Sequence, residues 1–330
     1  MPLQEIGWGI IGCGEVTERK SAPAFGQLPH SRLVAVMRRN AELAADYARR
    51  HGAARWYNDA QALINDPEVN VVYIATPPAL HCEYTLQVAA AGKSVYVEKP
   101  MALNTAECET MLVACQTAGV DLLVAYYRRA LPRFIKIREW IGSGCIGQVR
   151  HVTTVLYRKP LDKDIRGEHH WRIDPAMAGC GYFCDLAPHT IDILQFLVGP
   201  IATAYGVSTN QRRLYPAEDS VSAALRFESG AVGAGLWQFD SFAPLDRTEI
   251  VGDRGRITFA VFGDSAIRIE TGTLTEEYTI SNPDPIQKPL IETIIAQLRG
   301  LGSCPSTGAT AIATNRVMDQ ILGNRCGDAV

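Results

Sequence analysis

Two short stretches carry side chains suited to transferring a proton or stabilising charge on an oxygen. The first is Glu98-Lys99-Pro100, which directly follows the mostly β-branched and aromatic run 94–97. Such a run predicts a buried strand, and the strand cannot continue through Pro100 because proline lacks a backbone N–H. The carboxyl end of a strand in an open parallel sheet borders the crevice where ligands bind, so Lys99 could reach a reacting oxygen. The alternative is a surface turn in which Lys99 and Glu98 form a solvated ion pair.

The second stretch contains Asp185, His189 and Asp192, which are spaced i, i+4 and i+7. This spacing places the three side chains on one face of a helix. Carboxylates beside a histidine can raise its proton affinity and fix its ring, which suits a general acid or base near neutral pH. Pro188 removes one helical hydrogen bond, so the helix is either kinked or begins later than Gly179. The alternative is a histidine–aspartate pair on the surface of an amphipathic helix.

A glycine turn near the N-terminus separates a predicted strand, residues 6–11, from a helical stretch that runs to Leu28. Gly12 permits a tight turn, and Gly14 allows a pyrophosphate to approach backbone N–H groups at the start of the helix. Thr17 stands where a third glycine would pack the helix against the sheet. We expect a dinucleotide to bind at this turn, at Gly12, Cys13, Gly14, Glu15 and Val16.

The next predicted strand, residues 32–37, ends in Arg38 and Arg39. A fold that binds NAD usually has a carboxylate near this position, where it holds the ribose 2′-hydroxyl. Guanidinium groups pair instead with a 2′-phosphate, which a carboxylate would repel. The two arginines therefore favour NADP(H) over NAD(H). The alternative is that they are simply two exposed arginines on a loop.

Strands and helices continue to alternate as far as Ala125. The strand over 69–75 is followed by Thr76, Pro77 and His81, which with Glu98 and Lys99 are further candidates for cofactor contacts. His81 has an alternative, structural role as a helix cap. Helices are expected over 79–91 and 105–119, and a last strand over 121–125. This alternation predicts a parallel sheet with right-handed crossovers in a dinucleotide-binding domain of residues 1–125.

The pattern changes after Ala125. A helix to about Ile141 precedes a long strand over 148–157, and later strands are expected over 220–227, 231–239, 247–251 and 256–260. Successive strands without helices between them predict an antiparallel sheet, so residues 126–330 form a second, α+β domain of an α/β protein. Its expected pocket walls include Tyr127, Arg128, Tyr157, Trp171 and Arg172. Aromatic rings there suit a carbohydrate, and Arg128, Arg158, Lys159 and Arg172 would accept a carboxylate or phosphate.

Composition narrows the class of protein. The chain has 330 residues, of which 47% are apolar and 20% charged, with a formal net charge of −3. These values predict two globular domains and no attraction to nucleic acid or to an anionic membrane. The first strand begins too early for a signal peptide, so we expect a cytoplasmic protein. The nine cysteines are expected to be reduced, and no metal site is expected because Cys180 and Cys184 lack a second ligand pair.

Three motifs in this order resemble those of the Gfo/Idh/MocA family of NAD(P)-dependent oxidoreductases. They are Gly12-x-Gly14 after the first strand, Glu98-Lys99-Pro100 after a later strand, and Asp185-x-x-x-His189 behind a small-residue turn. Trp171-Arg172 is a further similar feature, and the resemblance extends from Ile6 to near Ile321. It implies a Rossmann domain, an α+β domain whose open sheet forms the contacts of a homodimer or homotetramer, and an active site between the domains.

The resemblance also implies roles for single residues. Lys99 would touch the reacting oxygen, His189 would donate or accept the proton, and Asp185 would position the substrate. The peptide before Pro100 is often cis in this family. We therefore expect reversible hydride transfer to or from a secondary alcohol or ketone of a sugar, polyol or related small molecule. Two alternatives are a nicotinamide-dependent glycosidase of the same fold and a non-catalytic, NADP-binding regulatory protein.

Overall fold

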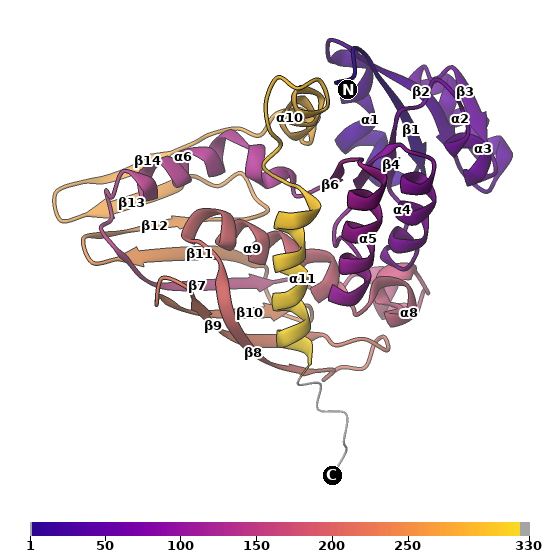
Figure 1. Ribbon diagram of the computed structural model, residues 1–330. Coiled ribbons are helices and arrows are strands. Elements are labelled where there is room, and N and C mark those ends of the chain that lie inside the picture. The colour runs from indigo at the N-terminus through magenta and orange to yellow at the C-terminus, as the bar shows by residue number, and fades with distance from the viewer. Residues whose placement is uncertain (1, 324–330) are drawn as a thin grey trace. The chain divides into compact units, whose positions relative to one another are not determined.

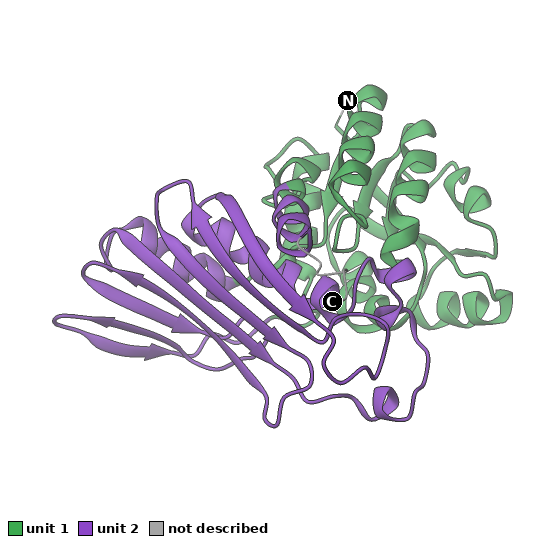
Figure 2. Cartoon of the chain, turned by 90° about the horizontal axis from the view of Figure 1, so that it is seen from below, with its two compact units in different colours: residues 1–131, 283–312 green, residues 132–282, 313–330 purple. Residues whose placement is uncertain are grey.

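The computed structural model of the protein describes residues 2–323. Its contacts divide the chain into two compact units (Figure 2). Residues up to 131 together with residues 283–312 form the first unit, and residues 132–282 together with the residues from 313 onward form the second. Within residues 2–323, no helix combines the length and the hydropathy needed to cross a bilayer.

The first unit is built on a six-stranded sheet whose neighbouring strands are all parallel, in the order β3-β2-β1-β4-β5-β6 (Figure 1). The strands are β1 (Ile6–Ile11), β2 (Ser31–Met37), β3 (Arg55–Tyr57), β4 (Val71–Ile74), β5 (Ser94–Val97) and β6 (Leu122–Val124). The short edge strand β3 was not expected from the sequence. The predicted Rossmann sheet is confirmed, and every residue of β1, β4 and β5 is buried, as a sheet covered on both faces requires.

The helices of this unit begin and end where polar caps and glycines allow. They are α1 (Ala22–Gln27), α2 (Ala41–His51), α3 (Ala60–Ile64), α4 (His81–Ala90), α5 (Thr105–Ala118) and α10 (Lys288–Leu298). The side chains of Asn40, Asp59 and Asn104 accept hydrogen bonds from the first turns of α2, α3 and α5. Gly52 and Gly119 end α2 and α5 in the left-handed conformation that glycine adopts without strain.

The chain returns to the first unit after residue 282, which differs from the sequence-based division at Ala125. Val124 of β6 donates to the carbonyl of Ser306 at 3.1 Å, and the Ser306 hydroxyl donates back to the Val124 carbonyl at 2.7 Å. The Gln297 amide also donates to Asp121 at 2.7 Å. The returning segment thus occupies the edge of the parallel sheet. Sequence pattern marks where strands stop alternating with helices, but it carries no signal for which sheet a later segment joins.

The second unit contains an eight-stranded sheet in the order β14-β13-β12-β11-β7-β10-β9-β8. Its strands are β7 (Val149–Tyr157), β8 (Ile201–Thr209), β9 (Ser220–Phe227), β10 (Val232–Gln238), β11 (Leu245–Gly252), β12 (Gly255–Phe259), β13 (Ile267–Thr271) and β14 (Thr275–Tyr278). All neighbours are antiparallel except β7 and β10, which run parallel. The mostly antiparallel sheet predicted for this half is confirmed, although β8, β13 and β14 were not anticipated.

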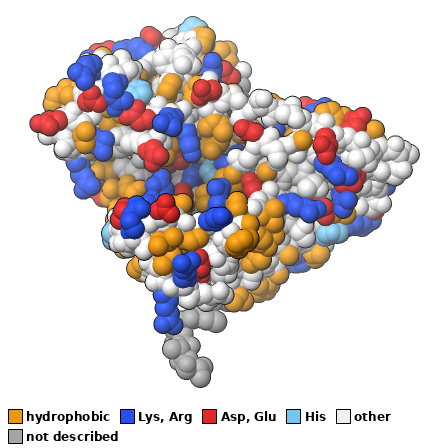
Figure 3. Space-filling model, turned by 180° about the vertical axis from the view of Figure 1, so that it is seen from behind, with side chains coloured by type: hydrophobic (Ala, Val, Ile, Leu, Met, Phe, Trp, Pro, Cys, Tyr) orange, Lys and Arg blue, Asp and Glu red, His pale blue; other side chains and the backbone are white. Residues whose placement is uncertain are grey.

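Helices lie along one face of this second sheet (Figure 1). The helices of this half are α6 (Pro132–Gly142), α7 (Asp162–Ile165), α8 (Pro175–Ala178), α9 (Tyr182–Val198) and α11 (Gly308–Leu322), the last of which belongs to both units. Helix α9 packs against α6 and is buried along most of its length. Figure 3 shows basic and acidic side chains interspersed over the face in view, as the small net charge predicts.

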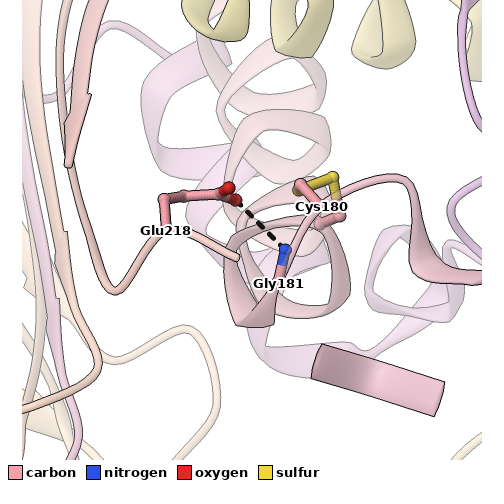
Figure 4. The surroundings of a disulfide bond; sticks show 4 residues. Cys180, Gly181 and Glu218 are labelled. Carbon is pink, nitrogen blue, oxygen red and sulfur yellow. Dashed lines mark hydrogen bonds between the residues drawn. A yellow bond between two sulfur atoms is a disulfide. The ribbon is translucent and has the colours of Figure 1, made fainter. Parts of the chain in front are cut away.

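The prediction that all cysteines are reduced is wrong for Cys180 and Cys184, which form a disulfide at the start of α9 (Figure 4). Between them, the backbone N–H of Gly181 donates to Glu218 at 3.1 Å. A Cβ at Gly181 would lie only 2.7 Å from that of Ala217, so a glycine is needed for this close approach. Six other cysteines are free thiols, at positions 13, 82, 108, 115, 145 and 304, and Cys326 lies outside the described residues.

Candidate functional site

Glu98 is a buried carboxylate directly beyond the carboxyl end of β5. The Tyr73 hydroxyl donates to its Oε1 at 2.6 Å, and the Gln287 amide donates to the same oxygen at 2.8 Å. The backbone N–H of Lys99 donates to Oε2 at 3.2 Å. Glu98 is 7% exposed, so these donors replace the hydrogen bonds that water makes to an exposed carboxylate. The network therefore holds the backbone of Lys99 in place.

Gln287 joins this network from the returning segment and was missed by the sequence analysis. Its Oε1 accepts a hydrogen bond of 2.7 Å from the Tyr96 hydroxyl, so its amide connects Tyr96 to Glu98. Burial, helped by the charge of Glu98, raises the pKa of both Tyr73 and Tyr96 well above the ordinary 10.0. Both tyrosines therefore remain neutral donors. A single glutamine far along the chain gave no sequence signal that it would be buried beside this carboxylate.

His81 links the loop after β4 to the peptide that follows Lys99. Its Nε2 lies 2.8 Å from the Thr76 carbonyl oxygen, and its Nδ1 lies 3.0 Å from the Pro100 carbonyl oxygen. The ring is fully buried, and burial lowers the pKa of His81. This is a structural position between two loops. The Lys99–Pro100 peptide is cis, in the form that the family resemblance implies.

The glycine turn after β1 has the space that a dinucleotide pyrophosphate needs. Gly12 has φ +90°, and a Cβ there would lie 2.9 Å from Thr76 Cγ2 and 3.0 Å from the Ala75 carbonyl. No neighbouring atom would lie closer than 3.9 Å to a Cβ at Gly14, so this position is open. The Thr17 hydroxyl bonds to the Gly14 carbonyl at 2.8 Å and closes the turn where a third glycine was expected. The chain thus fits a nicotinamide dinucleotide at this position.

The remaining side chains of the turn divide between core and solvent. Cys13 is buried, its thiol donates to the Met37 carbonyl at 3.5 Å, and burial raises its pKa to about 11. Its side chain therefore faces the core, which leaves its backbone for a ligand. Glu15 is exposed and Val16 is partly buried. The chain continues as a π-helix over Thr17–Ser21 before α1.

Arg38 and Arg39 are both exposed directly beyond the carboxyl end of β2. The backbone of Arg38 is held by a hydrogen bond of 3.2 Å from its N–H to the Tyr57 carbonyl. Among the described residues neither guanidinium is in an ion pair, so both are available to pair with an anionic ligand. In Rossmann folds, side chains just beyond this strand can distinguish a ribose hydroxyl from a ribose phosphate.

The second group of reactive side chains lies on α9, which continues from Tyr182 through Pro188. His189 is 5% exposed and Asp185 is partly exposed. The Asp185 carboxylate lies 3.4 Å from the Arg172 guanidinium. Asp192, the third residue of the predicted face, is buried and accepts a hydrogen bond of 3.5 Å from Thr314. Asp185 is thus the more accessible of the two carboxylates predicted beside His189.

A loop and a buried cluster near α9 were not singled out from the sequence. The ring of Phe262, between β12 and β13, lies 5.8 Å from the His189 ring at an interplanar angle of 78°. The Tyr182 hydroxyl donates to buried Asp164 at 2.7 Å, and His170 lies 2.8 Å from the same carboxylate. Burial, together with Asp164, raises the pKa of Tyr182, which therefore stays protonated. Aromatic residues between strands gave no pattern that connected them to His189.

The predicted site residues thus form separate groups within each unit. The glycine turn, the two arginines, Thr76, Pro77, His81, Glu98, Lys99, Tyr127 and Arg128 belong to the first unit. Tyr157, Trp171, Arg172, Asp185 and His189 belong to the second. Tyr127 and Arg128 are both buried in a 3₁₀ turn, Tyr127–Ala130, whereas Tyr157, Trp171 and Arg172 are partly exposed.

Family models match most of the chain. The model for the Gfo/Idh/MocA oxidoreductase family with an NAD-binding Rossmann fold matches residues 6–126. The model for the Gfo/Idh/MocA C-terminal domain matches residues 134–258. One match falls in each predicted half, and they contain Lys99 in the first and His189 in the second.

Individual proteins are similar over comparable lengths. Oxidoreductase P35 of Formosa agariphila is 38% identical over 319 residues, which are 96% of this chain and 98% of that protein. Levoglucosan dehydrogenase of Pseudarthrobacter phenanthrenivorans is 30% identical over 256 residues, which are 69% of this chain and 65% of that protein. The crystal structure of aldose-aldose oxidoreductase from Caulobacter crescentus with glycerol has a TM-score of 0.85 and 26% identity, and the match covers 96% of both chains.

Proposed function

This chain belongs to the Gfo/Idh/MocA family of oxidoreductases, and on that premise we propose that it transfers a hydride to or from a secondary alcohol or ketone of a sugar or polyol. The observation that carries the proposal is the buried network around Glu98, which holds the backbone of Lys99 at the carboxyl end of β5. A levoglucosan dehydrogenase among the relatives supports a carbohydrate substrate. A bound nicotinamide supplies or accepts the hydride.

We propose that His189 and Lys99 act on the same substrate oxygen. His189 takes the hydroxyl proton during oxidation and returns it during reduction, while the Lys99 ammonium stabilises the developing alkoxide. Asp185, with Arg172 beside it, accepts a hydrogen bond from a neighbouring hydroxyl and so orients the substrate. Tyr127, Arg128, Tyr157 and Trp171 are proposed as the further substrate contacts.

We propose NADP(H) as the preferred cofactor and NAD(H) as the weaker one. The exposed guanidinium groups of Arg38 and Arg39 would pair with the 2′-phosphate. The pyrophosphate would be held by backbone N–H groups of the turn at Gly12, Cys13, Gly14, Glu15 and Val16. Thr76 and Pro77 would contact the cofactor directly, and His81 would act by holding the Thr76 carbonyl.

We also propose that the protein forms a homodimer or homotetramer through the outer face of the second sheet. Tyr205, Val207 and Val232 are more than half exposed, and the strand register places them on one face. Large exposed apolar side chains on one face of a sheet can mark a protein contact. Sedimentation of the purified chain tests this, and a monomer at all concentrations would contradict it.

The experiment for the enzymatic proposal is nicotinamide absorbance with NADP(H) and NAD(H) against sugars, polyols, aldonates and their keto forms. The Lys99→Ala variant is the blank. We expect a substrate-dependent change in absorbance that is larger with NADP(H) and is lost in the variant. Tight NADPH binding without any turnover would contradict the proposal and would favour a binding protein or a glycosidase without net redox change.

A further inference from the structure

We propose that Arg158 and Phe262 form a subsite beside His189 that binds an oxyanion on the substrate, so that the preferred sugar or polyol carries a carboxylate or phosphate. This inference rests on the proposed function and names the substrate class more closely. All of the residues involved belong to the second unit.

The loop that carries Phe262 is held from two sides. The Asp246 carboxylate accepts hydrogen bonds from the backbone N–H groups of Val261, Phe262 and Gly263, at 3.0, 2.6 and 3.3 Å. The buried guanidinium of Arg133 donates to the carbonyls of residues 263, 265 and 260, at 2.5, 3.0 and 3.4 Å. A loop fixed through so many backbone groups presents the Phe262 ring in one place.

The Phe262 ring lies near both a proposed acid–base residue, His189, and a cation, Arg158. Its centroid lies 5.8 Å from the His189 ring, and the Arg158 guanidinium carbon lies 5.5 Å from the same centroid. A guanidinium over an aromatic face is attracted to the ring and is held there. The backbone of Arg158 is fixed as well, because its N–H donates to the Gln238 carbonyl at 2.8 Å and its carbonyl accepts from Ser241 at 2.9 Å. Arg158 is therefore a positioned cation on the same aromatic ring that lies against the proposed acid–base residue.

Arg158 is also available to pair with an anionic ligand. It is exposed, and within residues 2–323 it is in no ion pair. The nearby Asp246 carboxylate is already occupied by three backbone donors. Of the other cations expected near the substrate, Arg172 lies beside Asp185, Arg128 is buried in the first unit, and Lys159 lies over the ring of exposed Phe242.

A guanidinium beside an aromatic ring recognises oxyanions better than hydroxyl groups. Its planar fork donates two parallel hydrogen bonds to a carboxylate or phosphate, and such charge-assisted bonds are about twice as strong as neutral ones. The ring shields one side of the guanidinium from water and so lowers the local dielectric. When the carbinol of a sugar lies against His189, the site should therefore bind sugars that carry an acidic substituent near Arg158 more tightly than neutral sugars.

The test compares matched neutral and acidic probes, namely glucose, glucuronate, gluconate and glucose 6-phosphate, on the enzyme with NADP(H). The variants are Arg158→Met and Arg158→Lys. Arg150→Met is the control, because Arg150 is an equally charged, exposed residue of β7 near the opposite end of the strand, paired with Asp253 at 2.9 Å. Turnover is measured with all four probes, and binding is measured in parallel by the thermal shift that each probe causes.

We expect Arg158→Met to lower kcat/KM for the acidic probes by roughly 10- to 100-fold, through KM, and to leave glucose within about twofold. Arg158→Lys should recover part of this loss, and Arg150→Met should show no such loss. The carboxylate and phosphate arms show which oxyanion is preferred. Turnover of neutral and acidic probes alike, unaffected by Arg158→Met, would overturn the subsite and leave the proposed function intact. Arg158-dependent binding of acidic probes without any turnover would support the subsite and contradict the proposed function; no Arg158-dependent binding and no turnover would overturn both.

Discussion

Gln287 donates a hydrogen bond of 2.8 Å to the buried carboxylate of Glu98, although 189 positions separate the two residues in the sequence. The contact connects the returning segment to the strand that carries the predicted reactive lysine. Because the Lys99 N–H donates to the other oxygen of the same carboxylate, Gln287 helps to fix the backbone of Lys99 without touching a substrate itself. It is a positioning residue.

Replacing Gln287 by Leu should therefore lower the free energy of unfolding by more than an ordinary substitution on the surface does. The variant removes a donor from a buried carboxylate, and a hydrogen bond to a charged group contributes about 1.5–3 kcal/mol. Urea unfolding should show a loss of this size, whereas Gln61→Leu on the exposed face of α3 should stay within about 0.5 kcal/mol of the parent chain. Equal effects of the two exchanges would show that Gln287 does not support Glu98.

The parallel sheet of the first unit was predictable because its strands are short apolar runs separated by amphipathic helices. In β5, for example, all four residues are buried, and three of them are Val95, Tyr96 and Val97. Strands β13 and β14 were missed because Arg268, Glu270, Glu276 and Glu277 make them resemble loops, although alternate positions are buried in β13. The edge position of the returning segment depends on contacts between residues far apart in sequence, which local pattern does not contain.

Sequence could nominate candidate site residues to the extent that they lie within short motifs. Lys99, Asp185 and His189 follow from type and spacing, because a helix or a strand end places them. Gln287 and Phe262 act through contacts between distant segments, so their residue types alone carry no signal. The disulfide was missed because a spacing of four residues between Cys180 and Cys184 is equally compatible with two free thiols on a helix.

The pairing of Glu18 predicts that the free energy of unfolding of the first unit decreases at acid pH. The Arg50 guanidinium donates to both carboxylate oxygens at 2.7 Å, and this fork, with His51, lowers the pKa of Glu18 from 4.5 to about 2. A lowered folded-state pKa means that the ionised pair stabilises the fold fully above pH 4.5, and that this contribution is lost as the pH falls from 4.5 toward about 2.

Glu18→Gln should accordingly destabilise the protein near neutral pH, and the difference from the parent should shrink as the pH falls through this window. Urea midpoints measured at about pH 6 and about pH 3 check the sign. Glu83→Gln is the control and should show no such convergence, because the exposed Glu83 carboxylate of α4 accepts a hydrogen bond from neutral Gln87 and is in no ion pair among the described residues. A difference that grows at low pH would contradict the pairing with Arg50.

Cys180 and Cys184 should be protected from alkylation until the protein is reduced. Peptide mapping after unfolding in iodoacetamide should find both unlabelled, with the peptide lighter by two hydrogen atoms, while Cys108 and Cys115 are labelled in the same sample. A bond that closes so short a loop restricts the unfolded chain little, so its reduction should lower the free energy of unfolding by about 2 kcal/mol. Labelling of Cys180 and Cys184 before reduction would show that they are thiols.

His189→Ala should reduce turnover with little effect on cofactor binding. Loss of a general acid–base group costs roughly two to four orders of magnitude in kcat. His189 lies on α9 of the second unit, so the affinity for NADPH, measured by fluorescence, should remain within about twofold of the parent value. Unchanged turnover would remove His189 from the reaction, and a parallel loss of NADPH affinity would indicate a folding defect instead.

The last prediction concerns Arg38 and Arg39 and distinguishes an effect on the preference for NADPH over NADH from an effect on the binding of both cofactors. If the exposed guanidinium groups pair with the 2′-phosphate, Arg38→Met and Arg39→Met should weaken NADPH binding by roughly 10- to 100-fold and leave NADH affinity unchanged. The control is Arg49→Met in the last turn of α2, where the side chain is already paired with Asp46. Equal losses for NADPH and NADH would mean that the arginines stabilise the turn itself, and no loss for either would place the 2′-position elsewhere. Only a loss of affinity confined to NADPH is consistent with two cations that bind the 2′-phosphate, because NADPH and NADH share every other group.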